Sequence, residues 1–245
     1  MDYFQSTYPS SGRRSAEAFF KDSLSISPLV QRHLKLVYLT LCCALAASAL
    51  GVYLDMLFKI GGLLTLFGCL FTLFWLMSTP PHHERKKFGL LMVAALLEGS
   101  VVGPLINLAI KVDPSMVLTA FVGTSIAFGC FTAAAIVAKR REFLYLGGLL
   151  SSALSLLIWF RMASLFFFSQ LSMSVELYFG LLIFLGYIVY DTQHIIEKAH
   201  SGDFDFVGHA LILFTDFVAV FVRILRLMLE KSEHKSKREK QKKRT

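Results

Sequence analysis

The sequence predicts an all-α membrane protein, a polytopic bundle of seven hydrophobic helices, from its composition and from the length and continuity of its apolar runs. Hydrophobic residues make up 55% of the 245-residue chain, charged residues only 17%, and the mean hydropathy is +0.60. This apolar surface exceeds what a soluble domain buries, so lipid is expected to cover the remainder. The apolar runs do not alternate with period two, which argues against a transmembrane β-barrel.

Seven runs are long enough to cross a membrane, because a helix that rises about 1.5 Å per residue needs roughly 20 residues to span the hydrocarbon layer. They cover residues 34–54, 57–77, 88–110, 116–138, 143–168, 175–195 and 206–229. Pro104 lies inside the third run, where we expect it to kink the helix and not to end it. The seventh run carries Asp216, Arg223 and Arg226, so its full insertion is left open.

Polar segments flank the predicted bundle of residues 34–229. Residues 1–33 lack the apolar core and cleavage site of a signal peptide, so the first span is expected to act as the signal. Residues 230–245 carry eight Lys or Arg against three Glu. We favour a disordered basic tail and keep as an alternative a basic helix end that binds anionic lipid or calmodulin. The basic residues of that alternative are Arg223, Arg226, Lys231, Lys235, Lys237, Arg238, Lys240, Lys242, Lys243 and Arg244.

The distribution of Lys and Arg predicts the orientation in the membrane. The N-terminal segment and the second, fourth and sixth loops hold twelve such residues, whereas the first, third and fifth loops hold two. We therefore expect a cytosolic N-terminus. Seven full spans would put the basic tail on the other side. Because long basic tails usually stay cytosolic, we favour a cytosolic tail with a re-entrant or tightly buried last segment, and keep both topologies open.

The residue patterns of enzymes and resident cofactors do not appear in the sequence, so we expect a protein that is not an enzyme and has no nucleic-acid partner. The four cysteines lie inside the predicted spans without CxxC spacing, which favours packing roles. A zinc-dependent intramembrane hydrolase remains a minor alternative, since it needs several converging His or Cys ligands and the histidines here are scattered.

Ionisable residues inside the spans are the candidate functional residues, because such groups usually face the bundle interior or a water-filled path. Glu98 lies in the third run, Asp191 ends the sixth and Asp216 lies in the seventh. If the last two runs are antiparallel, Asp191 and Asp216 fall at similar depths. Two neighbouring carboxylates repel, so we expect the pair to keep a proton and to form a pH-responsive cation site, whose oxygen atoms suit Ca²⁺. The alternative is that both aspartates only fix the helix packing.

Four segments together carry a resemblance: "LEGSVVGP" in the third run, "YIVYDTQHII" at the end of the sixth, "LFTDFVAVFVRILRLM" in the seventh, and the lysine-rich end. In this order they make nearly the whole chain resemble the Bax inhibitor family, the proteins with the transmembrane Bax-inhibitor motif, and most of all its plant endoplasmic-reticulum members. The resemblance implies a seven-helix fold in which the last helix is central.

The resemblance also implies a function. Family members suppress programmed cell death in the endoplasmic-reticulum membrane and are associated with a pH-sensitive Ca²⁺ leak. Bacterial relatives use one aspartate on each of the last two helices, matched here by Asp191 and Asp216, and latch that pair with an arginine. Arg85 in "HHERKK" is the nearest candidate for the latch, and Glu98 is a candidate supporting residue.

Plant members bind calmodulin through the C-terminal tail, which agrees with the basic helix end. The expected partners are therefore membrane lipid, calmodulin and other membrane proteins. The alternative function is a non-conducting membrane scaffold that recruits calmodulin or other regulators through this tail.

Overall fold

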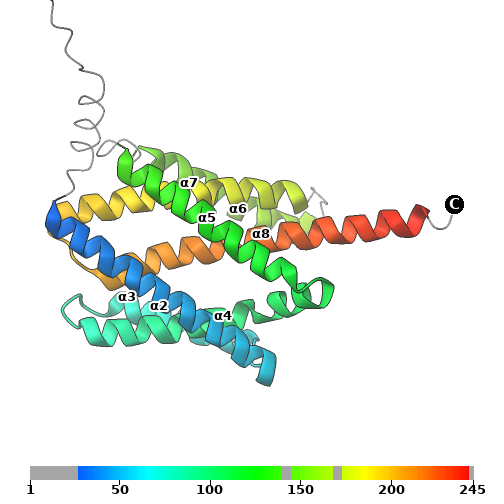
Figure 1. Ribbon diagram of the computed structural model, residues 1–245, viewed down its shortest axis with the longest axis horizontal. Coiled ribbons are helices and arrows are strands. Elements are labelled where there is room, and N and C mark those ends of the chain that lie inside the picture. Colours follow the sequence, from blue (N-terminus) through cyan, green and yellow to red (C-terminus); the bar gives the residue numbers. More distant parts are fainter. Residues whose placement is uncertain (1–26, 139–144, 168–172, 243–245) are drawn as a thin grey trace, which may run out of the picture.

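The computed structural model describes residues 27–138, 145–167 and 173–242, and all regular elements in these ranges are α-helices. The seven helices (Figure 1) are α2 (Pro28–Phe58), α3 (Leu63–Ser78), α4 (Glu84–Val112), α5 (Ser115–Val137), α6 (Leu146–Phe167), α7 (Met173–His200) and α8 (Phe206–Lys242). Each predicted apolar run contributes one helix, so the predicted fold class is confirmed. Pro104 lies inside α4, which continues past it as expected.

Within the described ranges, four helices are both long and apolar enough to cross a membrane: Pro28–Phe58, Glu84–Val112, Ser115–Val137 and Glu176–His200. The helix α3 has 16 residues, which is about 24 Å and shorter than the predicted run. It starts late because α2 ends at Lys59, whose backbone is left-handed (φ 51°) and whose N–H bonds to the Asp55 carbonyl oxygen. Gly61 and Gly62 then form the connection.

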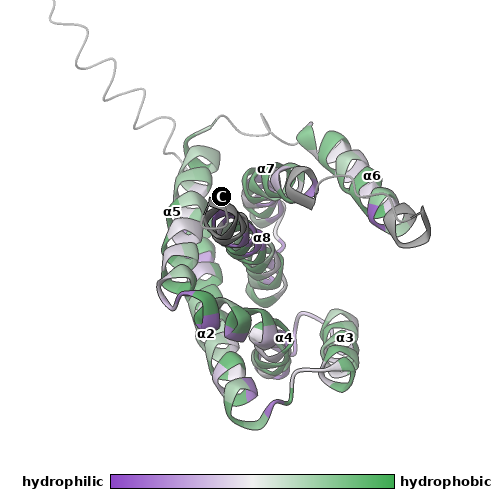
Figure 2. Ribbon diagram, turned by 90° about the vertical axis from the view of Figure 1, so that its right-hand side faces the viewer, coloured by the Kyte–Doolittle hydropathy of each residue, from purple (hydrophilic) through white to green (hydrophobic). Residues whose placement is uncertain are grey.

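The helix α8 lies at the centre of the bundle. It packs against α2, α4, α5 and α7, while the main partner of α3 is α4 and that of α6 is α7. Figure 2 shows α8 among these neighbours, with α3 and α6 outermost. The fully buried side chains of α8 include Val207, Leu213, Val220 and Leu225, which span about the first half of the helix. A helix that contains Asp216 is tolerated because its neighbours are protein and not lipid.

The "LEGSVVGP" segment allows α4 to touch α2 through backbone atoms. A β-carbon on Gly99 would lie 2.0 Å from the carbonyl oxygen of Ser48, and one on Gly51 would lie 2.0 Å from that of Leu96. The Ser100 hydroxyl donates a hydrogen bond to the Gly51 carbonyl oxygen at 3.1 Å. Small residues at both positions therefore fix the spacing of α2 and α4, as they do at close helix crossings in membranes.

The helix α8 is uninterrupted and runs from one end of the bundle to the other (Figure 1). At its start His209 contacts His33 near the start of α2, and towards its other end Leu229 packs in a cluster with Ile106 and Ala120. The tail therefore leaves the bundle at the end opposite the start of α2. Of the two forms that we favoured for the last segment, re-entrant or tightly buried, the described residues show the buried one, because α8 packs against four other helices. The cytosolic position of the N-terminus stays a prediction.

The tail also differs from the expected disorder, because α8 continues as a helix to Lys242. Lys243 and Arg244 lie outside the described residues. The helical form agrees with the basic helix end that we kept as an alternative.

Candidate functional site

Asp191 and Asp216 meet where α7 packs against α8, and their carboxyl groups are close enough to interact directly. Asp216 is only 5% exposed, and its Oδ2 atom has no hydrogen-bond partner in the part of the chain that the structure describes. Two ionised carboxylates repel and neither can donate a hydrogen bond, so a proton on one member of the pair would favour this contact. The structure thus joins two residues that the sequence placed at similar depths.

The aspartate pair has no direct cationic partner among the described residues. The described ion pairs join Lys87 to Asp205, Arg161 to Glu176 and His209 to Asp203. Lys198, two turns further along α7, is the cation whose charge acts on Asp191. None of these ion pairs includes a member of the aspartate pair.

Arg85, the candidate latch, is exposed in the first turn of α4 and does not contact the pair in this structure. The cation of the "HHERKK" segment that enters the bundle is Lys87, which is 5% exposed and forms an ion pair with Asp205. Asp205 lies immediately before α8 and not in the middle of the bundle. The segment thus supplies a buried cation, but at the end of the bundle where α7 turns into α8.

Glu98 lies away from the pair, in a separate cavity of about 260 Å³ between α3, α4 and α8. The Cys69 thiol donates a hydrogen bond to the Oε2 atom of Glu98 at 3.3 Å. This contact ties α3 to α4, which gives Glu98 a structural role. The structure does not bring it to Asp191 or Asp216.

Arg223, which we had grouped with the tail, belongs to the interior of the bundle. Its guanidinium group lies 4.1 Å from the ring centroid of Phe184 on α7, and it donates a hydrogen bond to the Ala219 carbonyl oxygen at 3.0 Å. Arg226 is exposed. A basic surface on this helix therefore begins at Arg226.

Sequence reasoning missed a polar cluster at the junction of α7 and α8, formed by His33, Lys87, Asp203, Asp205 and His209. We call it the end cluster. The Nε2 atom of His33 lies 2.8 Å from the Nδ1 atom of His209, and both side chains are buried. The Oδ2 atom of Asp203 lies 3.9 Å from the Nε2 atom of His209. The signal in the sequence is "SGDFDFVG", which places two acids directly before a helix.

Asp205 is the residue that joins the end cluster to the start of α8. Its Oδ1 atom accepts a hydrogen bond from the Gly208 backbone N–H at 3.1 Å, which is the geometry of a helix N-cap. Burial acts to raise the pKa of Asp205, but the hydrogen bonds from Lys87 and Gly208 and the nearby positive charge outweigh it and hold the pKa below its usual value. Asp205 is therefore ionised at neutral pH.

A further polar layer contributes groups from α2, α5 and α7. The hydroxyl groups of Tyr38, Thr132 and Thr192 interact, although none makes a hydrogen bond of standard geometry within the described residues. The Gln193 side chain donates to the Ala135 carbonyl oxygen at 3.3 Å. Thr192 and Gln193 directly follow Asp191, so α7 carries polar contacts to several neighbours at this level.

Comparison with known proteins identifies the family. The model of the family Bax1-I, described as inhibitor of apoptosis-promoting Bax1, matches residues 30–233. The chain is 61% identical to Bax inhibitor 1 of Oryza sativa subsp. japonica over 100% of both chains, and 60% identical to Bax inhibitor 1 of Arabidopsis thaliana over 96% of both. It is 43% identical to Bax inhibitor 1 of Homo sapiens, over 88% of this chain and 92% of that protein.

The family model covers all seven helices up to the first part of the tail, and these relatives match over nearly their whole length. The chain therefore belongs to the Bax inhibitor family.

Proposed function

We propose that this protein suppresses programmed cell death from the endoplasmic-reticulum membrane by acting as a pH-sensitive Ca²⁺ leak that Asp191 and Asp216 gate. The names of the family and of its relatives support the suppression of cell death. The observation that carries the gating is the close approach of two carboxyl groups inside the bundle, one on α7 and one on α8.

The chemistry of this contact supplies a switch. With one shared proton, the two carboxyl groups attract each other and hold α7 against α8. Loss of that proton leaves two negative charges in contact in a medium of low dielectric constant, where repulsion is strong. The helices then lose one of their contacts and carboxylate oxygens become available to a cation.

The geometry suits a Ca²⁺ ion that passes through better than a Ca²⁺ ion that stays tightly bound. Ca²⁺ takes six to eight oxygen ligands, of which two carboxylates supply only a part. In the described ranges no group of three or more His, Cys, Asp and Glu is arranged to hold a metal. Water and backbone carbonyl groups would complete the coordination of a Ca²⁺ ion at the pair.

Ca²⁺ efflux from liposomes that contain the purified protein, scanned across pH, tests this function. The variants Asp191→Asn and Asp216→Asn should each lose the pH dependence, because neither keeps a pair that can share and lose a proton. Asp113→Asn is the matched control, since Asp113 is an exposed loop carboxylate that accepts a hydrogen bond from the Ser115 N–H, which the side-chain oxygen of asparagine can also accept.

A pH profile that is unchanged in both dyad variants would remove the pair from the mechanism. If liposomes with folded protein release Ca²⁺ no faster than empty liposomes, the protein is not a Ca²⁺ leak.

A second function, recruitment of calmodulin by a non-conducting scaffold, is favoured by the helical basic extension of α8 to Lys242. This function requires a cytosolic tail. Because the tail and the start of α2 lie at opposite ends of the bundle, a cytosolic tail would place the N-terminus in the lumen (Figure 1). The count of basic residues in the loops predicts the reverse.

Glycosylation acceptor sites fused to either end of the chain distinguish the two functions. Modification at the C-terminus alone would place the tail in the lumen and exclude recruitment of cytosolic calmodulin. Modification at the N-terminus alone would allow it. A chain truncated after Glu230 should then fail to bind Ca²⁺-loaded calmodulin.

A further inference from the structure

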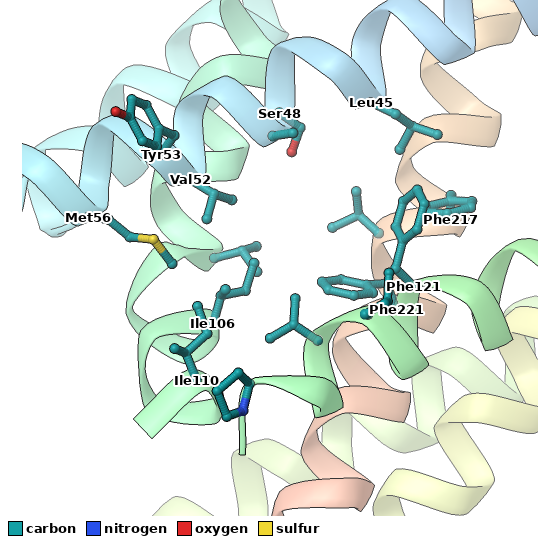
Figure 3. Close-up of a pocket in the computed structure, with 16 residues that line it drawn as sticks. Leu45, Ser48, Val52, Tyr53, Met56, Ile106, Ile110, Phe121, Phe217 and Phe221 are labelled. Atoms are coloured by element: carbon teal, nitrogen blue, oxygen red, sulfur yellow. The ribbon is translucent and has the colours of Figure 1, made fainter. Parts of the chain in front are cut away.

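An apolar cavity of about 630 Å³ lies between α2, α4, α5 and α8, separate from the aspartate pair. Figure 3 shows its wall, with Leu45 and Val52 from α2, Ile106 from α4, Phe121 from α5 and Phe217 from α8 around one space. Four helices thus enclose a volume that their own side chains do not fill.

The lining of this cavity excludes water as its occupant. Of the 16 lining residues, 14 have no polar side-chain group, and the exceptions are the hydroxyl groups of Ser48 and Tyr53. A water molecule needs two to four polar partners, which this wall does not offer. The volume is also far above the roughly 150 Å³ of apolar cavities that are known to stay empty. Hydrocarbon is the medium that surrounds the bundle and that matches this wall.

The depth of the cavity matches one leaflet of a bilayer. Its lining on α2 runs from Met56, near the end of that helix, inward to Leu45. These twelve residues rise about 16 Å, close to half of the roughly 30 Å of hydrocarbon in a bilayer. Pro114, at the turn between α4 and α5, also lines the cavity and marks the same end of the bundle. The space therefore runs from the membrane surface to near its midplane.

The wall is open towards the bilayer, and its outer end is flanked by positive charge. Tyr53 and Leu118 are lining residues with exposures of 59% and 66%, so a chain can enter from the side. The exposed residues Lys59 and Lys111 follow shortly after Met56 and directly after the lining residue Ile110. They are the two basic residues of the loops at this end. A phosphate group at the membrane surface would find its counter-charge there.

We propose that this cavity binds one acyl chain of a membrane phospholipid from the leaflet at this end, with the phosphate near Lys59 and Lys111. The inner end of the bound chain contacts Phe217, whose ring packs edge-on against Phe121 with centroids 5.8 Å apart. Phe217 directly follows Asp216, so the lipid becomes part of the packing that holds α8. This binding site does not depend on whether the protein conducts Ca²⁺.

Photolabelling of the full-length protein in liposomes tests the proposal. The probe is a phosphatidylcholine with a diazirine near the end of one acyl chain, and adducts are mapped by mass spectrometry. Adducts should concentrate on the inner lining residues, such as Leu45, Phe121 and Phe217, and their yield should saturate as the fraction of probe rises. A yield that rises in simple proportion to the probe would identify ordinary contact with bulk lipid and overturn the site.

A pair of double variants provides the matched comparison. Ala49→Phe with Val117→Phe fills the cavity from two sides and should abolish most of the saturable labelling. Ala46→Phe with Val122→Phe adds the same side chains to exposed positions on the same helices outside the lining, and should leave labelling unchanged. Equal labelling in both double variants would also overturn the proposal. The saturation measurement on the natural chain needs no variant, so a folding defect cannot obscure the result.

A change at the two lysines tests whether the bound acyl chain belongs to a phospholipid or to a free fatty acid. Lys59→Gln with Lys111→Gln should weaken labelling by the phospholipid probe and leave labelling by a diazirine fatty acid unchanged. If the fatty acid labels the same residues as strongly as the phospholipid in the natural chain, the site takes free fatty acid and the phospholipid assignment is wrong.

Discussion

The helices α7 and α8 are joined at two places by opposite kinds of chemistry. In the end cluster, the buried cation of Lys87 meets the carboxylate of Asp205, and the two buried histidines His33 and His209 share a hydrogen bond. At the aspartate pair, two acids meet without a cation in direct contact among the described residues. The first junction is complete near neutral pH, whereas the second exists only while a proton is present.

The end cluster is therefore a fixed point of the bundle, and the aspartate pair is a variable point. The end cluster ties the connection between α7 and α8 to α2 and α4, so this connection cannot move away from α4 without breaking a buried ion pair. The aspartate pair lies further along both helices. Loss of its proton can therefore open the helices like a hinge, about an end that stays closed.

The largest expected effect is at the fixed point. Lys87→Met removes the cation and leaves the carboxylate of Asp205 without its partner, which should lower the free energy of unfolding by about 3 kcal/mol. Thermal unfolding in detergent measures this loss. Lys86→Met is the matched control, because Lys86 is exposed and lies 5.4 Å from the centroid of the Trp75 ring, a contact of about 0.5 to 1 kcal/mol. If both variants lose the same free energy of unfolding, the buried ion pair of Lys87 does not make the end cluster a fixed point.

The variable point should respond to pH in amide hydrogen exchange. Above the pH at which the natural pair loses its proton, exchange along the middle of α7 and α8 should accelerate beyond the intrinsic pH effect, by about tenfold for a lost contact of roughly 1.4 kcal/mol. Asp191→Asn should show no such acceleration, because an amide can donate to Asp216 at any pH. The helices α2 and α4 serve as the internal reference. Uniform acceleration in all four helices would contradict a local opening.

A smaller loss is expected from the histidine pair. His33→Gln should weaken or remove the contact with His209 and reduce the free energy of unfolding by about 1 kcal/mol, the usual contribution of one hydrogen bond. His82→Gln changes an exposed histidine at the same end of the bundle and should have no measurable effect. If both variants unfold at the same temperature as the natural chain, the histidine contact does not stabilise the end cluster.

The smallest change is expected from mild acid. Since the pKa of Asp205 is held below its usual value, the stabilisation from its ionised form is fully present above the pKa of the unfolded chain and is lost as the pH falls through the folded pKa. The stability difference between the natural chain and Asp205→Asn should thus stay constant from about pH 7 to 5 and disappear only in stronger acid. A difference that grows on acidification would have the wrong sign.

Much of this arrangement could be predicted from residues close together in the sequence. Continuous apolar runs predicted all seven helices, and the positions of Asp191 and Asp216 on two adjacent runs predicted their similar depths. The short helix α3 could not be predicted, because its start depends on the left-handed backbone of Lys59. The path of α8 depends on packing with four other helices, which hydropathy does not report.

The cation of the end cluster shows the same limit. "HHERKK" offers three consecutive basic residues, and the one that faces inward depends on where α4 begins. Arg85 and Lys87 are two residues apart, so their side chains leave the helix in directions that differ by about 200°. A shift of two residues in the start of α4 therefore changes which of them faces inward. The contact of His33 with His209 joins residues 176 positions apart and leaves no local pattern in the sequence.

The contact of α2 with α4 at Gly51 and Gly99 has a mechanical consequence. Backbone atoms meet there, so no side chain can change its rotamer to absorb a displacement. A shift of α8 must therefore move α2 and α4 as one body or stop at them. On the opposite side of α8, the neighbouring helices meet it through deformable side chains such as Phe184 and Phe121. The bundle thus has one stiff wall, in which α2 and α4 move together, and one compliant wall, in which side chains can rearrange around the central helix.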